Sequence, residues 1–363
     1  MTLLSRYLVR QNLFLLFTVL LVGTGLYILT EMFERLDNFL ESSSGVSMML
    51  VYFGVKIPTI IAMILPAVYM IAVVVQMNFL ERSRELVALE AGGVTPSAIV
   101  RFVLLYGLFW ALAQFTFGQV FGVTGERIAS RIWQEDVRGR IIEQAHIIGL
   151  WFTEQNRIIH IGLTYPVQQK GKDINVYTLD DTGIGIMEMI KAKDFVVESD
   201  GTWVLLGGKI LKPAEYTATP FQRLELPIRQ DLRAFQVSTH TGVKPTQLSL
   251  PELRDTIHRL EQAGSNVEGL RAAWHGKISY ACSIIILGLL ALAVSRATGN
   301  IYKSVVASLL IVFAYYGVNT ICMSMGEKGL LNPALGAWFA NGVFFCAGSA
   351  WLLWPTFLRR LHG

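Results

Sequence analysis

The chain has 363 residues, of which 53% are hydrophobic and only 16% are charged. Its mean hydropathy of +0.46 is typical of a protein that lies in a membrane for much of its length. The formal net charge of +4 is too small to indicate a nucleic-acid partner. Composition therefore excludes an ordinary water-soluble enzyme or nucleic-acid-binding protein.

Six apolar stretches approach the length of about 20 residues that an α-helix needs to cross a bilayer. Three precede and three follow a long polar block, which predicts six transmembrane helices in two groups of three. Arg6 and Arg10 precede the first stretch and no small-residue cleavage site follows it, which favours a retained signal anchor. The stretches are residues 13–30, 57–80, 102–121, 278–295, 302–323 and 334–354.

The ends of these stretches differ in charge, which predicts their orientation. With the N-terminus inside, the cytoplasmic ends carry nine Lys and Arg residues and the short opposite ends carry three. Both termini are therefore predicted to be cytoplasmic, with the polar block outside. The cytoplasmic set is Arg6, Arg10, Arg82, Arg84, Arg101, Arg296, Lys303, Arg359 and Arg360, and the outer set is Arg35, Lys56 and Lys328.

The polar block reads mostly as short strands. Runs rich in β-branched and aromatic residues alternate with turn signals at residues 180–183, 199–201 and 207–208, a pattern that favours a sandwich, barrel or jelly roll. All three cysteines, Cys282, Cys322 and Cys346, fall in apolar stretches, so no disulfide is expected in the block. The predicted strands are residues 157–163, 173–179, 194–198, 202–206 and 224–227.

A short helix is predicted to lead from this block back to the membrane. Ser249 and Glu252 have the spacing of a capping box. Leu253, Ile257 and Leu260 then recur at helical spacing, and Gly264 ends the pattern.

Residues 80–100 form a second informative segment, between the second and third apolar stretches. Arg84–Ala91 is rich in helix formers, Gly92-Gly93 stops the helix, and Thr95-Pro96 can begin the next one. A short helix that presents apolar and acidic groups in a cytoplasmic loop is suited to docking. The alternative interpretation is a solvated connector that turns the chain around.

The sequence contains no apparent source of energy or catalytic centre. No phosphate-binding loop is present, since Gly207-Gly208-Lys209-Ile210 lacks the spacing and the hydroxyl of one. The six histidines are scattered and no His, Glu or Cys pair has metal-ligand spacing. We therefore expect no catalytic residues, cofactor or metal, and we expect energy to come from a partner protein.

Three features together resemble the LptF/LptG permeases of lipopolysaccharide export. They are the six apolar stretches divided by a β block, the segment Arg6-Tyr7-Leu8-Val9-Arg10, and the segment RSRELVALEAGGVT from Arg82 to Thr95. The resemblance covers nearly the whole chain. Leu150-Trp151, the helix at 248–264 and Trp274–Ile278 are more similar to the LptG branch, with LptF as the alternative.

The resemblance implies an α-helical polytopic membrane protein with six transmembrane helices and an inserted all-β, jelly-roll-like periplasmic domain. Residues 1–125 would hold transmembrane helices 1 to 3, with a coupling helix at about 82–94. Residues 126–274 would form the periplasmic domain with flanking helices, and residues 275–363 would hold helices 4 to 6.

The resemblance also implies partners and a location. An LptG-like permease in the bacterial inner membrane pairs with an LptF-like permease and two copies of an LptB-like ATPase, and passes lipopolysaccharide through its β domain toward an LptC-like bridge protein. ATP hydrolysis would belong to the separate ATPase. The coupling residues would be Arg84, Glu85, Leu86, Leu89, Glu90 and Gly93.

Lipid contacts follow the family less closely. The family places basic residues at the outer end of the first helix, where residues 31–37 here are mainly acidic and only Arg35 is positive. Arg127, Arg131 and Lys277 are candidate replacements, although each could equally mark the interface by snorkelling. The candidate inner-face residues of the β domain, which could also be ordinary core, are Ile159, Ile161, Val176 and Val204.

Two other classes of function remain as alternatives at this point. A membrane-bound enzyme acting on envelope lipids would need a cluster of catalytic residues near one membrane depth, and none is evident. A scaffold or sensor would use the outer domain to bind a partner. Co-purification of a separate ATPase would distinguish the transport function from both.

Overall fold

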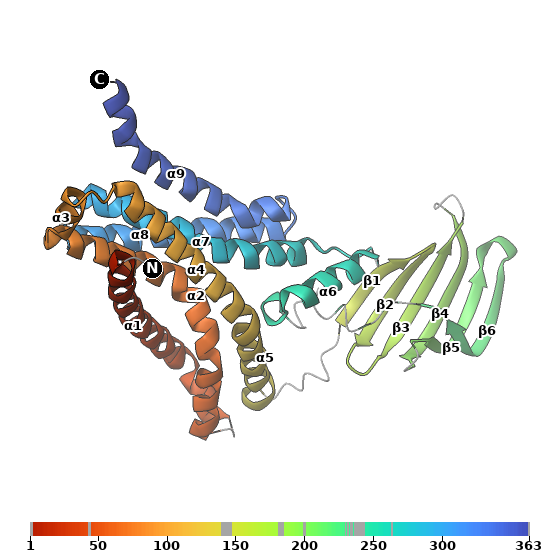
Figure 1. Ribbon diagram of the computed structural model, residues 1–363. Helices are drawn as coiled ribbons and strands as arrows, with labels where there is room; N and C mark the ends of the chain where they lie inside the picture. The colour runs from red at the N-terminus through yellow and green to blue at the C-terminus, as the bar shows by residue number, and fades with distance from the viewer. Residues whose placement is uncertain are drawn as a thin grey trace. The chain divides into compact units, whose positions relative to one another are not determined.

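The computed structural model describes residues 3–42, 45–138, 147–180, 185–198, 201–228, 230, 232, 235, 244–262 and 264–361, with side chains as far as Leu352 in the last helix. The chain divides into two compact units (Figure 1). One comprises Met1–Ser130 and Ala272–Gly363 and is helical; the other comprises Arg131–Arg271 and contains a β-sheet.

Six helices are long and apolar enough to cross a membrane, as the sequence predicts. Three precede and three follow the sheet in the chain, so the predicted polytopic helical fold with an inserted β domain is confirmed. The described cysteines are all free and lie in the last three helices. The helices are α1 (Leu3–Glu41), α2 (Gly45–Arg82), α4 (Pro96–Phe117), α7 (Glu268–Thr298), α8 (Ile301–Glu327) and α9 (Pro333–Leu361).

The third of these helices is the longest continuous one. After α4 it passes through a π-helical turn η1 (Gly118–Gly122), α5 (Val123–Arg131) and a second π-helical turn η2 (Ile132–Val137). Near η1 it packs tightly on α2, because Thr59 donates a hydrogen bond of 3.0 Å to the Gly122 carbonyl. π-turns inside helices often mark functional positions.

Tyr69 of α2 joins three helices of the bundle. Its side chain is fully buried and its hydroxyl donates a 2.7 Å hydrogen bond to the Val103 carbonyl of α4. A Cβ added at Gly107 would lie 3.2 Å from the Tyr69 hydroxyl, and one at Gly288 would lie 2.7 Å from its ring. These glycines therefore let α4 and α7 close around the ring, as small residues commonly do in membrane helix packing.

Pro66 interrupts the hydrogen bonding of α2, and side chains from other helices compensate. Proline has no N–H, so the Ala62 carbonyl four residues earlier loses its usual donor. Gln114 of α4 donates to that carbonyl at 3.1 Å, and Tyr280 of α7 donates to the adjacent Met63 carbonyl. Such compensation is needed where no water can reach the backbone.

The second unit contains a six-stranded antiparallel sheet in which each strand pairs with the next in sequence. Its strands overlap all five predicted runs, and β1 is a further strand (Figure 1). β4 begins at Ile186, well before the predicted start at Asp194. The strands are β1 (Ile147–Glu154), β2 (Arg157–Tyr165), β3 (Lys170–Leu179), β4 (Ile186–Val197), β5 (Trp203–Lys212) and β6 (Thr217–Leu226).

The predicted turn at Gly207-Gly208 is wrong, because β5 runs through both glycines. Gly207 has φ +62°, and a Cβ added at Gly208 would lie 2.5 Å from the Phe221 ring of β6. Gly207 therefore permits an irregular backbone conformation within β5, and Gly208 leaves room for the Phe221 ring. At the predicted turn over residues 199–201, the Glu198 N–H donates a 2.9 Å hydrogen bond to the Thr202 carbonyl, although residues 199–200 lie outside the described ones. Most of the predicted turn at residues 180–183 also lies outside the described residues.

The predicted return helix is confirmed as α6 (Leu250–Gln262). Both the backbone N–H and the hydroxyl of Ser249 donate to the Glu252 carboxylate at 2.7 Å. Leu253, Ile257 and Leu260 are the buried residues of the helix, as their spacing predicts. Gly264 follows with φ +66°, a conformation that favours glycine at a helix end.

Candidate functional site

The short helix α3 (Glu85–Ala91) joins α2 to α4 at one end of the helical unit (Figure 1). Arg84 precedes it with φ 60°, a left-handed conformation that costs a non-glycine residue about 1 kcal/mol. Gly93 follows it with φ +87°, and Pro96 then begins α4. The sequence thus correctly predicted the end of this helix and placed its start one residue early, and Arg84 and Gly93 both lie in the connections that flank it.

The two sides of α3 have different environments. Leu86 packs against the core of the helical unit and lines a cavity of about 130 Å³ with Met77, Ile99 and Leu292. Val87, by contrast, is 65% exposed. The helix is therefore attached to its own bundle on one side and open on the other.

The remaining coupling candidates also differ. The Glu85 carboxylate accepts a 2.8 Å hydrogen bond from the Tyr7 hydroxyl of α1, which connects α3 to the first helix. Leu89 is half-buried. Glu90 is exposed and lies at the same cavity as Leu86.

Neutral amides connect α1 to α2 near the same end of the bundle. Asn12 donates a 2.8 Å hydrogen bond to Gln76, and Gln76 donates one of 2.8 Å to the Leu8 carbonyl. Asn12 is 1% exposed and Gln76 is completely buried. This pair was not predicted from the sequence, although two amides in apolar helices indicate a buried contact.

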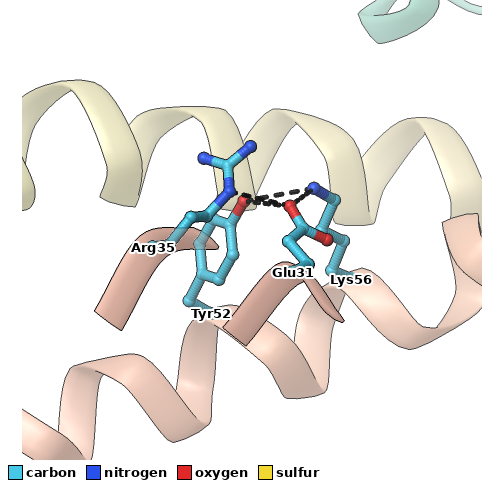
Figure 2. Close-up of polar contacts among 4 residues, drawn as sticks. All are labelled: Glu31, Arg35, Tyr52 and Lys56. Atoms are coloured by element: carbon cyan, nitrogen blue, oxygen red, sulfur yellow. Dashed lines mark hydrogen bonds and ion pairs between the residues drawn. The ribbon is translucent and has the colours of Figure 1, made fainter. Parts of the chain in front are cut away.

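A charged cluster connects α1 to α2 at the other end. Figure 2 shows Arg35, Tyr52 and Lys56 pointing toward the same carboxylate oxygen, Oε1 of Glu31. The Arg35 nitrogen lies 2.9 Å and the Tyr52 hydroxyl 3.2 Å from this atom, and Lys56 forms an ion pair with it. The Glu31 side chain is only 7% exposed, so these partners offset the cost of burying a carboxylate there.

This cluster changes how the acidic end of α1 is understood. The one predicted cation there, Arg35, is paired with Glu31 and its side chain is 27% exposed. Lys56, which sequence analysis did not select, adds a second positive charge. Counting Glu31, Arg35 and Lys56 gives a formal charge of −1 + 2 = +1. Glu34 and Asp37 are exposed and lie outside the cluster.

The other predicted cations lie on α5 and α7. Arg127 is exposed on α5, and Lys277 is half-buried on α7. Arg131 forms a 2.8 Å ion pair with Glu135, four residues later on the same continuous helix. Among the described residues, no group of three or more His, Cys, Asp or Glu side chains could hold a metal ion.

One face of the sheet, here called the inner face, carries Ile159, Ile161 and Val176. All three are fully buried, and Ile159 lies directly opposite Val176 in the β2–β3 ladder. The rings of Phe152 on β1 and Trp203 on β5 are 6.0 Å apart although three strands separate β1 from β5. The sheet must therefore curve, with the inner face on its concave side.

A single row of residues across the sheet changes the alternation of its strands. Within a strand, residues that point to the inner face are normally two positions apart, because side chains alternate between the two faces. Where a strand passes through this row, the spacing becomes three positions, as between Ile147 and Leu150 or between Ala192 and Phe195. Three members of the row have positive φ angles of 68°, 54° and 62°. The row consists of Gly149, Gly162, Asp173, Lys193 and Gly207.

This row determines which β5 residues belong to the inner face. Trp203 lies there because its ring contacts Phe152, so Leu205 shares that face and Val204 points to the opposite one. Val204 is nevertheless buried, at 4% exposure. Regular alternation of side chains predicted that Val204 would share the inner face with Ile159. The positive φ of Gly207, which shifts the alternation of β5, could not be read from the sequence.

The described residues form six membrane-length helices, with a β-sheet between the third and fourth and a short helix between the second and third. This arrangement defines a polytopic membrane protein with an extramembrane domain. Residues 6–354 match the family model of the lipopolysaccharide export system permease LptF/LptG. The chain belongs to this family, and is therefore a permease subunit of lipopolysaccharide export. Comparison with curated proteins gives no match.

Proposed function

We propose that the chain is the LptG-like half of an exporter that takes lipopolysaccharide from the bacterial inner membrane and passes it toward the outer membrane. It would pair with an LptF-like permease, two LptB-like ATPase subunits and an LptC-like bridge protein. Family membership supports the transport role, and the sequence lacks a phosphate-binding loop of its own. The excess of Lys and Arg at one end of the helices supports cytoplasmic termini and a periplasmic sheet.

The observation that carries this proposal is the two-sided environment of α3. Leu86 holds α3 against the transmembrane bundle, so a force on α3 reaches α2, α4 and α7 directly. Val87 and Glu90 remain exposed for a partner. A short helix in a groove gains affinity from a few apolar anchors, whereas charges select the partner. We assign Val87 to the ATPase groove and Glu90, three residues later and therefore a neighbour of Val87 on the helix surface, to a basic group beside it.

Co-purification of the ATPase tests this assignment. Reversing the charge in Glu90→Lys should reduce the amount of ATPase recovered with the permease by about tenfold, since one desolvated charge pair is worth more than 1.4 kcal/mol. The matched control is Glu41→Lys, which reverses an exposed charge at the far end of α1. Equal recovery from Glu90→Lys and the unaltered chain, with normal coupling of hydrolysis to export, would contradict the docking role of α3.

The outer end of the bundle is where we propose that the phosphates of the lipid bind. Arg35 and Lys56 give the Glu31 cluster a surplus positive charge, and Arg127 and Lys277 are further candidates. A partly desolvated cation that meets a phosphate gains a hydrogen bond worth roughly 1.5–3 kcal/mol, whereas a snorkelling cation gains little. Arg131 is the weakest candidate because its side chain is 74% exposed and already paired with Glu135.

The inner face of the sheet is where we propose that the acyl chains pass. Each methylene kept from water is worth about 0.8 kcal/mol, so the chains need an apolar route. Ile159, Ile161, Val176 and Leu205 supply apolar surface on the concave side. Phe235 contacts Phe152 there, with ring centroids 5.0 Å apart, so the lipid must displace part of the chain itself.

Photo-crosslinking tests the route. Crosslinkers at Ile159, Val176 and Leu205 should capture lipopolysaccharide in an ATP-dependent manner. A crosslinker at Val204 is the matched control, because it is the next residue along the same strand on the opposite face. Capture at Val204 without capture at Leu205 would refute the route.

A further inference from the structure

The outer face of the sheet, opposite the inner face, carries three aromatic rings in contact. The Trp151 ring on β1 lies 4.2 Å from the His160 ring on β2, measured between centroids. The Tyr177 ring on β3 lies 6.4 Å from the Trp151 ring, with the two planes only 9° apart. Trp151 is 56% exposed. Trp151, His160 and Tyr177, here called the aromatic row, thus form a continuous aromatic surface that is exposed at Trp151 and half-buried at His160 and Tyr177.

Polar groups continue this surface across the sheet. His160 lies between Trp151 and Asn175 in the ladders, and its Nδ1 is 3.4 Å from the Asn175 amide nitrogen. Asn175 is only 6% exposed although it lies on the outer face. The next two partners in the same line are Lys191 and Lys209, both exposed. The Asp173 carboxylate lies 3.9 Å from the Lys191 ammonium in an exposed pair.

The chemistry of this line fits a saccharide with negative charges. The C–H groups of a sugar ring form an apolar patch with partial positive charge, which suits the electron-rich face of an indole or phenol ring. Amide and imidazole groups donate to and accept from hydroxyls, and ammonium groups meet phosphates or carboxylates. An aromatic surface that leads directly to an amide and two lysines therefore combines the contacts that a phosphorylated or acidic sugar requires.

We propose that the aromatic row, Asn175, Lys191 and Lys209 bind the saccharide part of the transported lipid while its acyl chains lie on the inner face. The proposal rests on the function proposed above. β1 is an edge strand of the described sheet, so a molecule with its tails on the concave side reaches Trp151 by passing one strand. A purely apolar protein partner would instead bury His160, Asn175 and the lysines without satisfying them, at a cost.

Binding of a lipid-free oligosaccharide, released from lipopolysaccharide by mild acid, tests the site on the full-length chain in a lipid nanodisc. Trp151→Ala and Tyr177→Leu should each weaken binding by about fivefold, since one aromatic contact is worth roughly 1 kcal/mol. Tyr177→Leu retains apolar bulk on the strand, and an unchanged melting temperature would show that the sheet is intact. Tyr216→Ala is the matched control, because this residue is 98% exposed on the β5–β6 turn. Its binding should be unchanged.

Charge gives an independent arm of the same test. Lys191→Ala with Lys209→Ala should weaken binding of the phosphorylated oligosaccharide and leave binding of its dephosphorylated form unchanged. Absence of saturable binding to the unaltered chain, or equal losses in Tyr216→Ala, would overturn the proposal. Loss of complex assembly in Trp151→Ala without oligosaccharide binding would also overturn it and identify a protein interface.

Lipids with different saccharides separate this proposal from the proposed function. Trp151→Ala should slow export of lipopolysaccharide that carries its full saccharide and leave export of a sugar-truncated form unchanged. Equal slowing of export for the two lipid forms would contradict saccharide recognition by this site and would leave the proposed transport function unaffected. Absence of lipid crosslinks at Ile159 and Leu205, despite oligosaccharide binding, would refute the lipid route and leave the saccharide site standing.

Discussion

The two ends of α1 are fastened to α2 by different chemistry. At one end, Glu31 is held by Arg35, Lys56 and Tyr52, so the contact consists of charges. At the other, Gln76 bonds Asn12 and the Leu8 carbonyl, so the contact consists of neutral amides. Loss of Glu31 leaves two neighbouring cations without the carboxylate that they share, whereas loss of an amide leaves only an unpaired dipole. The comparison indicates that two contacts between the same pair of helices can differ widely in the stability that their removal costs.

The largest effect is expected from removing the buried carboxylate. Glu31→Ala leaves Lys56 and Arg35 together without their counter-ion, which should cost about 3 kcal/mol of stability. Thermal unfolding of the purified complex measures this, with Glu34→Ala as an exposed control one turn away. Adding Lys56→Met to Glu31→Ala should restore much of the loss. If Glu31→Ala and Glu34→Ala melt alike, the charged end is not a structural contact.

A smaller effect is expected at the amide end. Gln76→Leu leaves the Asn12 side chain without its partner inside the bundle, which should cost about 1–2 kcal/mol. The double variant Asn12→Leu with Gln76→Leu removes both polar groups, and its melting temperature should return toward that of the unaltered protein. A double variant less stable than either single one would contradict this account.

The smallest effect on stability is expected where α1 meets α3. Tyr7 is 43% exposed, so Tyr7→Phe removes one hydrogen bond to Glu85 at a cost within about 0.5 kcal/mol. If this bond carries motion from α3 to α1, less lipid will be exported per ATP while the melting temperature stays the same. Tyr302→Phe, at a residue 78% exposed on α8, is the control. Normal export per ATP in Tyr7→Phe would restrict the coupling path to α2, α4 and α7.

The elements of the fold were predictable where each follows from local sequence. Membrane-length apolar runs predicted all six helices, and Ser249 with Glu252 predicted the start of α6. The course of β5 was not predictable in this way, because Gly207-Gly208 reads as a turn unless the approach of Phe221 is known. That approach is a contact between strands, which one-dimensional patterns do not contain.

The candidate sites were likewise predictable where they depend on local sequence and not where they depend on contacts between distant segments. The location and ends of α3 were readable from Arg84 to Gly93, but the side on which Leu86 lies depends on packing against α2, α4 and α7. The acidic stretch after residue 30 predicted a poor anion site, since sequence alone could not pair Glu31 with Lys56 across two helices. The partner of a buried charge is a property of the fold rather than of its neighbours in sequence.

The order of strands in the sheet has a consequence for how the protein is made. Every ladder joins strands that are adjacent in sequence, so each hairpin can form as soon as its two strands are available. Hairpins form in about 1–10 μs, whereas synthesis adds roughly 5–20 residues per second. The six strands can therefore pair before α7, α8 and α9 have been translated. Substitutions that delay insertion of the last three helices should leave this early pairing of the strands unchanged.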